Sequence, residues 1–282
     1  MIYLSTGGWS NSTAFESAER LVDNGMRFIE FSGGKYDPHC TARLSLMAQK
    51  CDIQIHNYFP PPADPFVFNL ASLVEDVANK SMLHAIRAIE LASILGLGLY
   101  SFHAGFLLDP NVRDLGEEFK VGSVVDREIG LNLFLERVNE LSQFASRLGI
   151  RLLIENNVLS STNQKAFDGN PFLMADHHEC SFVMRNTPEN VSLLLDVAHL
   201  NVSSNSLAFS KIEFIEMANE YTFAYHLSDN DGLSDSNEPV TTDSWFWPYI
   251  RKDLTYYTLE VYGVSVGELK RQVELTERIL LS

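Results

Sequence analysis

With 282 residues, 45% of them hydrophobic, the chain has material for a large core and is expected to fold as one globular domain over residues 1–282. Its formal net charge of −16 disfavours nucleic acid and anionic membrane surfaces as partners, because it repels phosphate groups over the whole molecule. The chain shows no signal-like or membrane-spanning apolar run, and its three cysteines lack C-x-x-C spacing, so we expect a cytoplasmic protein.

Short apolar or β-branched runs alternate with longer stretches of helical periodicity along the whole chain. We expect strands at residues 2–6, 27–31, 53–57, 99–103, 151–155, 192–196, 222–226 and 256–261. Helices are expected at residues 13–24, then between the second strand and Lys50, and at 81–95, 126–148, 207–219, 243–252 and 265–281. Eight such units predict an α/β fold, a single-domain (β/α)8 TIM barrel, which typically needs roughly 250 residues.

Metal-ligand side chains stand at the ends of the last four predicted strands, namely Glu155, Asp196, His226 and Glu260. In a closed parallel barrel the carboxyl ends of the strands meet at one rim, so these side chains should converge. Three carboxylates and an imidazole suit one divalent cation, and without a cation their charges would repel one another. The spacing therefore predicts a metal site at this rim.

Other rim positions carry side chains that suit the binding of a polar substrate. His56 and His103 end the third and fourth strands, and His199 follows Asp196 closely. We expect these histidines to orient substrate hydroxyl groups, although each could instead be a hydrogen-bonded structural imidazole. Trp9, next to the end of the first strand, is expected to line the pocket.

The same residues suggest a reaction. Moving a carbonyl group, or inverting the carbinol beside it, requires removal of a weakly acidic proton, and a bound cation stabilises the resulting enediolate. Two carboxylates on opposite faces of the reacting carbon can then act as base and acid. Glu155 and Glu260 are separated by three strands around the ring and are assigned these catalytic roles.

Four short motifs together resemble the xylose isomerase-like barrel superfamily: I-E-N-N (154–157), L-D-V-A-H (195–199), H-L-S-D (226–229) and L-E-V (259–261). The resemblance implies that Glu155, Asp196, His226 and Glu260 hold one divalent ion, either Mn, Mg, Zn or Co. It also implies that the two glutamates exchange the substrate proton and that His199 contacts the sugar. The expected function is therefore a metal-dependent isomerase or epimerase of a sugar or sugar phosphate.

Two alternatives stay open at this point. An endonuclease IV-type phosphodiesterase of the same superfamily would need three metal ions and a D-x-H motif, where this chain has Asp243-Ser244-Trp245 without the imidazole. The negative charge of the chain also argues against a nucleic-acid substrate. A barrel that binds metal and sugar without catalysis uses the same ligand residues and is not excluded by them.

The predicted rim loops add three expectations. The proline- and aromatic-rich segment 57–72 is interpreted either as a preformed apolar wall around a sugar ring or as a packed surface loop. The run 176–180, with two histidines and two acids, is interpreted as a lid or an oligomer contact rather than a metal motif, which leaves a homo-oligomer open. The basic residues that could reach a substrate phosphate are Lys35, Arg113, Lys120, Lys165 and Arg185.

Overall fold

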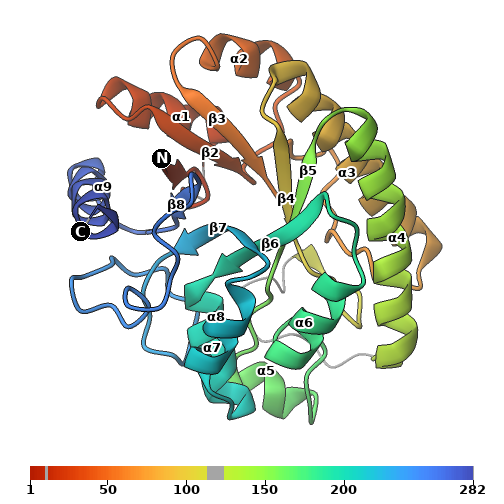
Figure 1. Cartoon of the computed structure of the whole chain (residues 1–282). Helices are drawn as coiled ribbons and strands as arrows, with labels where there is room; N and C mark the ends of the chain where they lie inside the picture. The colour runs from red at the N-terminus through yellow and green to blue at the C-terminus, as the bar shows by residue number, and fades with distance from the viewer. Residues whose placement is uncertain (10–11, 113–123, 282) are drawn as a thin grey trace.

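The computed structural model describes residues 1–9, 12–112 and 124–281. Its strands are all parallel and close into a barrel in the order of the sequence, with β8 paired to β1 (Figure 1). They are β1 (Ile2–Ser5), β2 (Phe28–Ser32), β3 (Asp52–His56), β4 (Leu99–His103), β5 (Arg151–Glu155), β6 (Val191–Asp196), β7 (Thr222–Leu227) and β8 (Tyr257–Leu259). The predicted TIM barrel is confirmed.

Helices surround the barrel and cover its outer face (Figure 1). They are α1 (Ala14–Asp23), α2 (Cys40–Met47), α3 (Glu75–Leu95), α4 (Arg127–Arg147), α5 (Ser161–Ala166), α6 (His177–Arg185), α7 (Val197–Leu207), α8 (Lys211–Ala218) and α9 (Val266–Leu280). Capping residues in the sequence mark the start of several of these helices. Thr13 and Glu16 form a reciprocal capping box at the start of α1, which satisfies backbone N–H groups that have no partner inside the helix.

Side chains alternate between the two faces of each strand, and this alternation builds two layers of core. Outward-facing residues pack against the helices in the main hydrophobic cluster. Inward-facing residues form a smaller apolar cluster inside the barrel, made of Tyr3, Leu99, Leu153, Leu194, Ala224 and Tyr256. Leu153 and Leu194 each lie two residues before a predicted ligand, Glu155 and Asp196, so those ligands also point inward, one layer nearer the rim.

Strand register then brings the rim residues to one level. His103 is paired with Glu155 across β4 and β5, and Asp196 is paired with His226 across β6 and β7. Glu260 directly follows β8, and its peptide N–H donates to the carbonyl of Leu227 at the end of β7 (3.1 Å). The ends of five neighbouring strands, β4 to β8, are thus held together by the backbone of the barrel.

One helix prediction was wrong, and a second differs from the structure in its extent. The segment 243–252 contains turns instead of a helix, because Pro248 lacks the N–H that a helix interior requires. The predicted helix 207–219 is found as the shorter α8, whereas α7 before it was not predicted, and a break where Ala208 has a φ of 57° separates the two. The Ser- and Asn-rich sequence of α7 gives little helical signal, whereas in the structure it is almost wholly buried.

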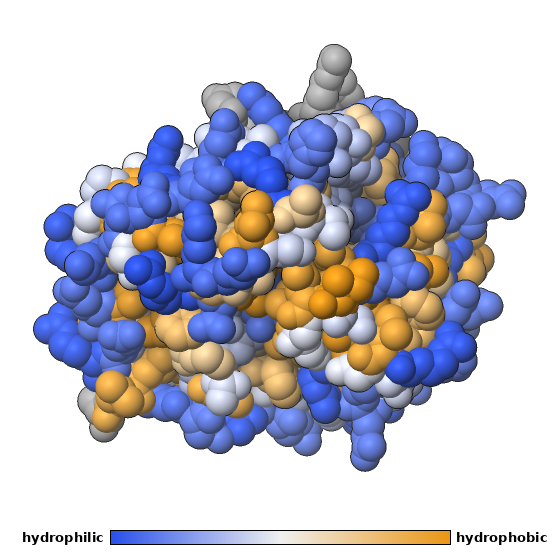
Figure 2. Space-filling model, turned by 90° about the horizontal axis from the view of Figure 1, so that it is seen from above, coloured by the Kyte–Doolittle hydropathy of each residue, from blue (hydrophilic) through white to orange (hydrophobic). Residues whose placement is uncertain are grey.

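The run 176–180 is the start of α6. The side chain of Asp176 accepts hydrogen bonds from the peptide N–H groups of His178 and Glu179, both at 3.0 Å, and so caps the helix. Its role as a lid or oligomer contact stays a prediction. The face of the molecule seen in Figure 2 is largely hydrophilic, with apolar side chains in smaller patches. Among the described helices, none combines the length and apolarity needed to cross a membrane.

Candidate metal centre and substrate cavity

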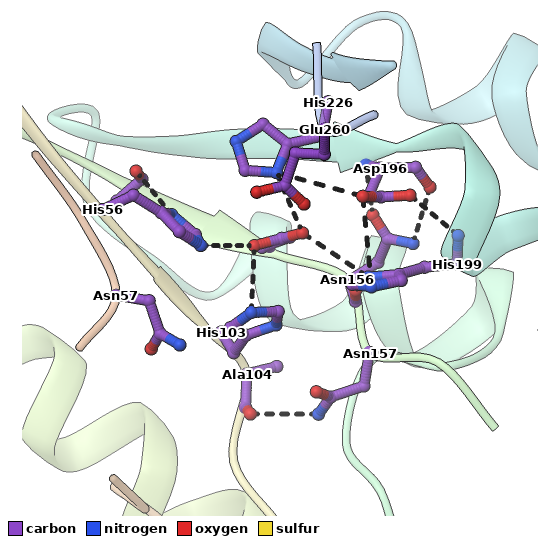
Figure 3. A network of polar contacts seen from close by, with 12 residues as sticks. His56, Asn57, His103, Ala104, Asn156, Asn157, Asp196, His199, His226 and Glu260 are labelled. Carbon is purple, nitrogen blue, oxygen red and sulfur yellow. Dashed lines mark hydrogen bonds and ion pairs between the residues drawn. The ribbon is translucent and has the colours of Figure 1, made fainter. Parts of the chain in front are cut away.

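The structure brings the four predicted metal ligands together. Glu155, Asp196, His226 and Glu260 each offer a ligand atom, and these atoms all lie within 4.8 Å of one another. All four residues are buried, and Figure 3 shows Asp196, His226 and Glu260 directed toward a common point. This cluster is a candidate site for one metal ion.

Unsatisfied polar atoms test whether the cluster fits a cation. Both carboxylate oxygens of Glu155, Oδ2 of Asp196 and Nδ1 of His226 are buried and have no hydrogen-bond partner. Buried polar atoms without partners are costly, and a site that gathers several of them requires an explanation. Oxygen atoms from carboxylates together with one imidazole nitrogen are ligands that divalent metals accept. The residues present therefore fit a divalent ion.

Asp196 and Glu260 are each held by a second contact through one carboxylate oxygen. Oδ1 of Asp196 accepts the peptide N–H of His199 (2.7 Å) and caps α7, while Oδ2 faces the cluster. The amide of Asn156 bonds both the N–H and the carbonyl of Asp196, which ties the end of β5 to the end of β6. Tyr262 donates to Oε1 of Glu260 (3.1 Å). Such outer contacts fix the direction of metal ligands.

Glu30, which sequence reasoning missed, orients His226. It is fully buried on β2, and its Oε2 lies 3.2 Å from Nε2 of His226. The same oxygen accepts the hydroxyl groups of Tyr256 and Thr258, so Nε2 of His226 carries its proton toward a carboxylate acceptor and Nδ1 is left for a metal. A charged residue in the middle of the apolar run RFIEF was the available signal, because a buried carboxylate needs partners.

Removing the carboxylate of Glu30 should weaken metal binding without touching a ligand. We expect Glu30→Leu to lower metal affinity by about 10- to 100-fold, since the tautomer and direction of His226 are no longer fixed. Glu30→Gln keeps an acceptor oxygen and should lose less metal affinity than Glu30→Leu. Calorimetric titration of the metal-free variants with manganese measures the effect. Equal affinity of parent and Glu30→Leu would contradict this role.

The three other histidines predicted at the site lie around Glu155. Nε2 of His56 and Nε2 of His103 lie 3.2 Å and 3.4 Å from Oε2 of Glu155. Nδ1 of His199 lies 3.4 Å from its Oε1 and also 2.9 Å from the carbonyl oxygen of Asn156. The structure thus places His56, His103 and His199 with the ligands, as Figure 3 shows.

Burial and crowding shift the proton affinities of the cluster. Burial raises the pKa of Asp196 to about 7, and Glu155 adds to this shift against the opposing effect of His199. Burial by itself lowers the pKa of His226, but Glu30, Glu260 and Glu155 raise it well above its ordinary value. Without a cation, protons therefore supply the positive charge that the carboxylates need.

These pKa shifts predict that metal affinity rises with pH. A metal must displace the proton that Asp196 holds up to about pH 7, as well as the proton on His226, whose pKa is also raised. We expect affinity to increase between pH 5 and pH 7 by up to about tenfold per pH unit for each proton released. Manganese titrations in buffers of different ionisation enthalpy count the released protons. An affinity that does not change over this range would contradict the expectation.

The cluster opens into a cavity of about 1080 Å³ at the carboxyl ends of the strands. His56, His103, His199 and Glu260 line its polar end. Asp235 also lines it, with Oδ2 3.3 Å from Nε2 of His199, and sequence reasoning missed this residue because it lies in the loop after β7. The polar end of the cavity therefore combines imidazoles and carboxylates beside the candidate metal site.

Trp9 and most of the predicted basic residues lie elsewhere. Trp9 is not among the described residues that line the cavity, and Arg20 lies over its ring at 5.8 Å. Lys35 lines the cavity, whereas Lys165 and Arg185 are on α5 and α6 and do not. The other two predicted basic residues, Arg113 and Lys120, lie outside the described residues.

Comparison with known proteins identifies the family. The sequence profile of the xylose isomerase-like TIM barrel family matches residues 18–265. The chain belongs to this family. Among curated proteins, no sequence matches the chain at a significant level.

Solved structures of similar fold cover nearly the whole chain. A D-tagatose 3-epimerase-like protein superposes with a TM-score of 0.72 at 17% identity, over 99% of this chain and 97% of the other. A D-psicose 3-epimerase with D-tagatose, from Clostridium cellulolyticum, gives 0.67 at 13% identity over 99% of both chains. A protein from Thermus thermophilus soaked with zinc chloride gives 0.60 at 19% identity over 98% of both. At these identities the likeness shows the fold.

Proposed function

We propose that this protein is an isomerase or epimerase of a small sugar that depends on one divalent metal ion, either Mn, Mg, Zn or Co. The observation that carries the proposal is the convergence of Glu155, Asp196, His226 and Glu260, with buried unbonded ligand atoms, at the polar end of a cavity. Solved structures of the same fold described as D-psicose 3-epimerase, with D-tagatose and with D-fructose, support the choice of a ketose.

The two glutamates are assigned the proton transfer. When bound, the metal would supply positive charge that stabilises negative charge on the sugar oxygens as a proton leaves the adjacent carbon. Glu260 lines the cavity, and Glu155 is fully buried at the end of β5, next to the histidines that line the polar end of the cavity. A carboxylate on either side of the reacting carbon can remove the proton and return it, and return to the opposite face inverts that carbon.

The histidines are assigned to substrate positioning. Burial lowers the pKa of His103 to about 4 against the opposing effect of Glu155, so its ring is neutral at neutral pH and can both donate and accept a hydrogen bond. Its side chain is 27% exposed, toward the cavity that it lines. His199 lies between Asp235 and Glu155, where it can contact a sugar hydroxyl.

Solvent exchange tests the proposal. The manganese-loaded protein, incubated with D-tagatose, D-psicose and D-fructose in deuterated water, should place deuterium on the carbon beside the carbonyl. Conversion without deuterium uptake would indicate a hydride shift and remove the glutamates from proton transfer. Binding of these sugars without conversion or exchange would instead indicate a sugar-binding barrel and overturn the enzymatic proposal.

A further inference from the structure

The cavity is much larger than a single sugar ring requires. Pockets for drug-sized ligands typically measure roughly 300–1,000 Å³, and this cavity of about 1080 Å³ reaches the upper end of that class. Of the four residues assigned to metal binding and proton transfer, Glu260 lines the cavity, at its polar end. The remaining space is available to a substituent on the sugar.

Away from this polar end, one side of the cavity is lined mainly by apolar side chains, whereas polar residues such as Asn157, Ser160 and Thr162 line other parts of it. One wall comes from the loop after β3 and carries Tyr58, Phe66 and Phe68 together with three prolines. Phe106 and Phe172 line it as well, with their rings packed edge to face at 5.4 Å. Aromatic rings in such arrangements favour a further ring at an offset or edge-to-face position, with centroids roughly 4.5–7 Å apart.

This aromatic wall is held in place from behind. The ring of Tyr58 stacks on His84 at 5.3 Å, and Phe68 packs against Phe102 at 5.8 Å. The hydroxyl of Tyr58 accepts the peptide N–H of Phe66 at 2.6 Å, which closes the loop on itself. A wall fixed before binding loses little freedom when a ligand packs on it, and this favours tight binding of a rigid apolar group.

The wall suits an aromatic ring better than a second sugar. Pro61, Pro62 and Pro65 have no N–H, and Phe66 and Phe68 have no polar side-chain atom, so this wall offers a sugar's hydroxyls few partners besides the hydroxyl of Tyr58. Hydroxyl groups buried there without partners would weaken binding. An uncharged aromatic ring has no such requirement.

Charge argues against a phosphate as the substituent. Lys35 is the one lysine or arginine among the described residues that line the cavity, and it shares the cavity with Asp235 and Glu260. Phosphate recognition in proteins usually relies on charge-assisted hydrogen bonds from several cationic or backbone donors. The lining therefore favours a neutral ligand.

We propose that the substrate is a neutral sugar with an aromatic substituent, placed so that the carbonyl carbon and its neighbour stay free to react. The sugar lies at the polar end beside the metal site, and the aromatic group packs between the wall of Tyr58, Phe66 and Phe68 and the pair Phe106 and Phe172. This inference rests on the proposed function for the identity of the sugar end. The apolar wall itself does not depend on the reaction.

One series of ketoses tests the inference. It compares a ketose with its benzyl ether, its glucosyl derivative and its phosphate ester, all at the terminal carbon away from the carbonyl, on the D-fructose, D-tagatose and D-psicose skeletons. For the manganese-loaded protein, affinity by calorimetry and kcat/KM for solvent exchange should both be about tenfold or more higher for the benzyl ether than for the parent ketose. A preference for the parent, the glucosyl derivative or the phosphate would overturn the inference.

Variants locate the effect and separate it from the proposed function. Phe66→Ala and Phe106→Ala should reduce the ratio of benzyl ether to parent ketose, whereas Phe182→Ala, exposed on α6, should leave the ratio unchanged. Equal loss of this ratio in Phe182→Ala would overturn the assignment to the cavity.

Tight binding of the benzyl ether without solvent exchange would support the aromatic subsite and refute the proposed enzymatic function. Equal exchange of every ketose would support the enzymatic function and refute the aromatic subsite.

Discussion

Replacing Glu155 or Glu260 by glutamine is expected to lower turnover by about 10²- to 10⁴-fold, because glutamine keeps an oxygen ligand and nearly the same shape but cannot take up the substrate proton. Metal affinity should fall much less than turnover. The two quantities therefore separate proton transfer from metal binding. Steady-state kinetics with the best ketose, together with manganese titration of each variant, measure both.

A matched substitution provides the control for these two variants. Glu277 is exposed in the last turn of α9 and is not among the residues that line the cavity, so Glu277→Gln should retain the turnover of the parent. Turnover within tenfold of the parent in both Glu155→Gln and Glu260→Gln would remove these residues from proton transfer. A loss of turnover that is proportional to the loss of bound metal would show that Glu155 and Glu260 act only as ligands.

Asp196→Asn and His226→Ala are expected to abolish stoichiometric metal binding and, with it, activity. Each removes one of the four converging ligand atoms, because alanine has none, and an asparagine whose oxygen keeps the bond to the N–H of His199 turns an NH2 group, which cannot bind a cation, toward the cluster. Asparagine is preferred to alanine at position 196, because its side-chain oxygen can still accept the N–H of His199 and keep the cap of α7. Elemental analysis after dialysis against the metal measures the occupancy.

Two surface substitutions control for this experiment. Asp243→Asn and His178→Ala change the same residue types at exposed positions and should bind a full equivalent of metal. Circular dichroism and thermal melting establish that all four variants are folded. Retention of a full equivalent of metal in both Asp196→Asn and His226→Ala would show that the ion binds elsewhere.

The strands and the convergence of the four candidate ligands could be predicted from sequence, because both follow from local pattern plus one geometric rule. Apolar runs mark buried parallel strands, and the carboxyl ends of parallel strands in a barrel must meet. By that rule, Glu155, Asp196 and His226 at three successive strand ends approach one another, and this does not depend on the conformation of the loops. The confirmed family resemblance depends on the same strand-end motifs.

Contacts between distant segments were decided only by the tertiary structure. Glu30 and His226 are separated by 196 residues, and no local pattern says that one will orient the other. Asp235 reaches His199 from an irregular loop, whose path depends on packing rather than on periodicity. Trp9 was expected at the pocket from its place near a strand end, yet its ring lies against Arg20 instead.

The sequence by itself determined the barrel and the four residues that converge at its rim, because the carboxyl ends of parallel strands meet at one rim and alternation turns residues two apart along a strand to the same face. The tertiary structure alone decided the cavity and its aromatic wall. Loops after different strands, such as those carrying Phe66, Phe106 and Phe172, come together only once the barrel has closed. Their packing is set by long-range contacts, which short-range sequence patterns do not encode.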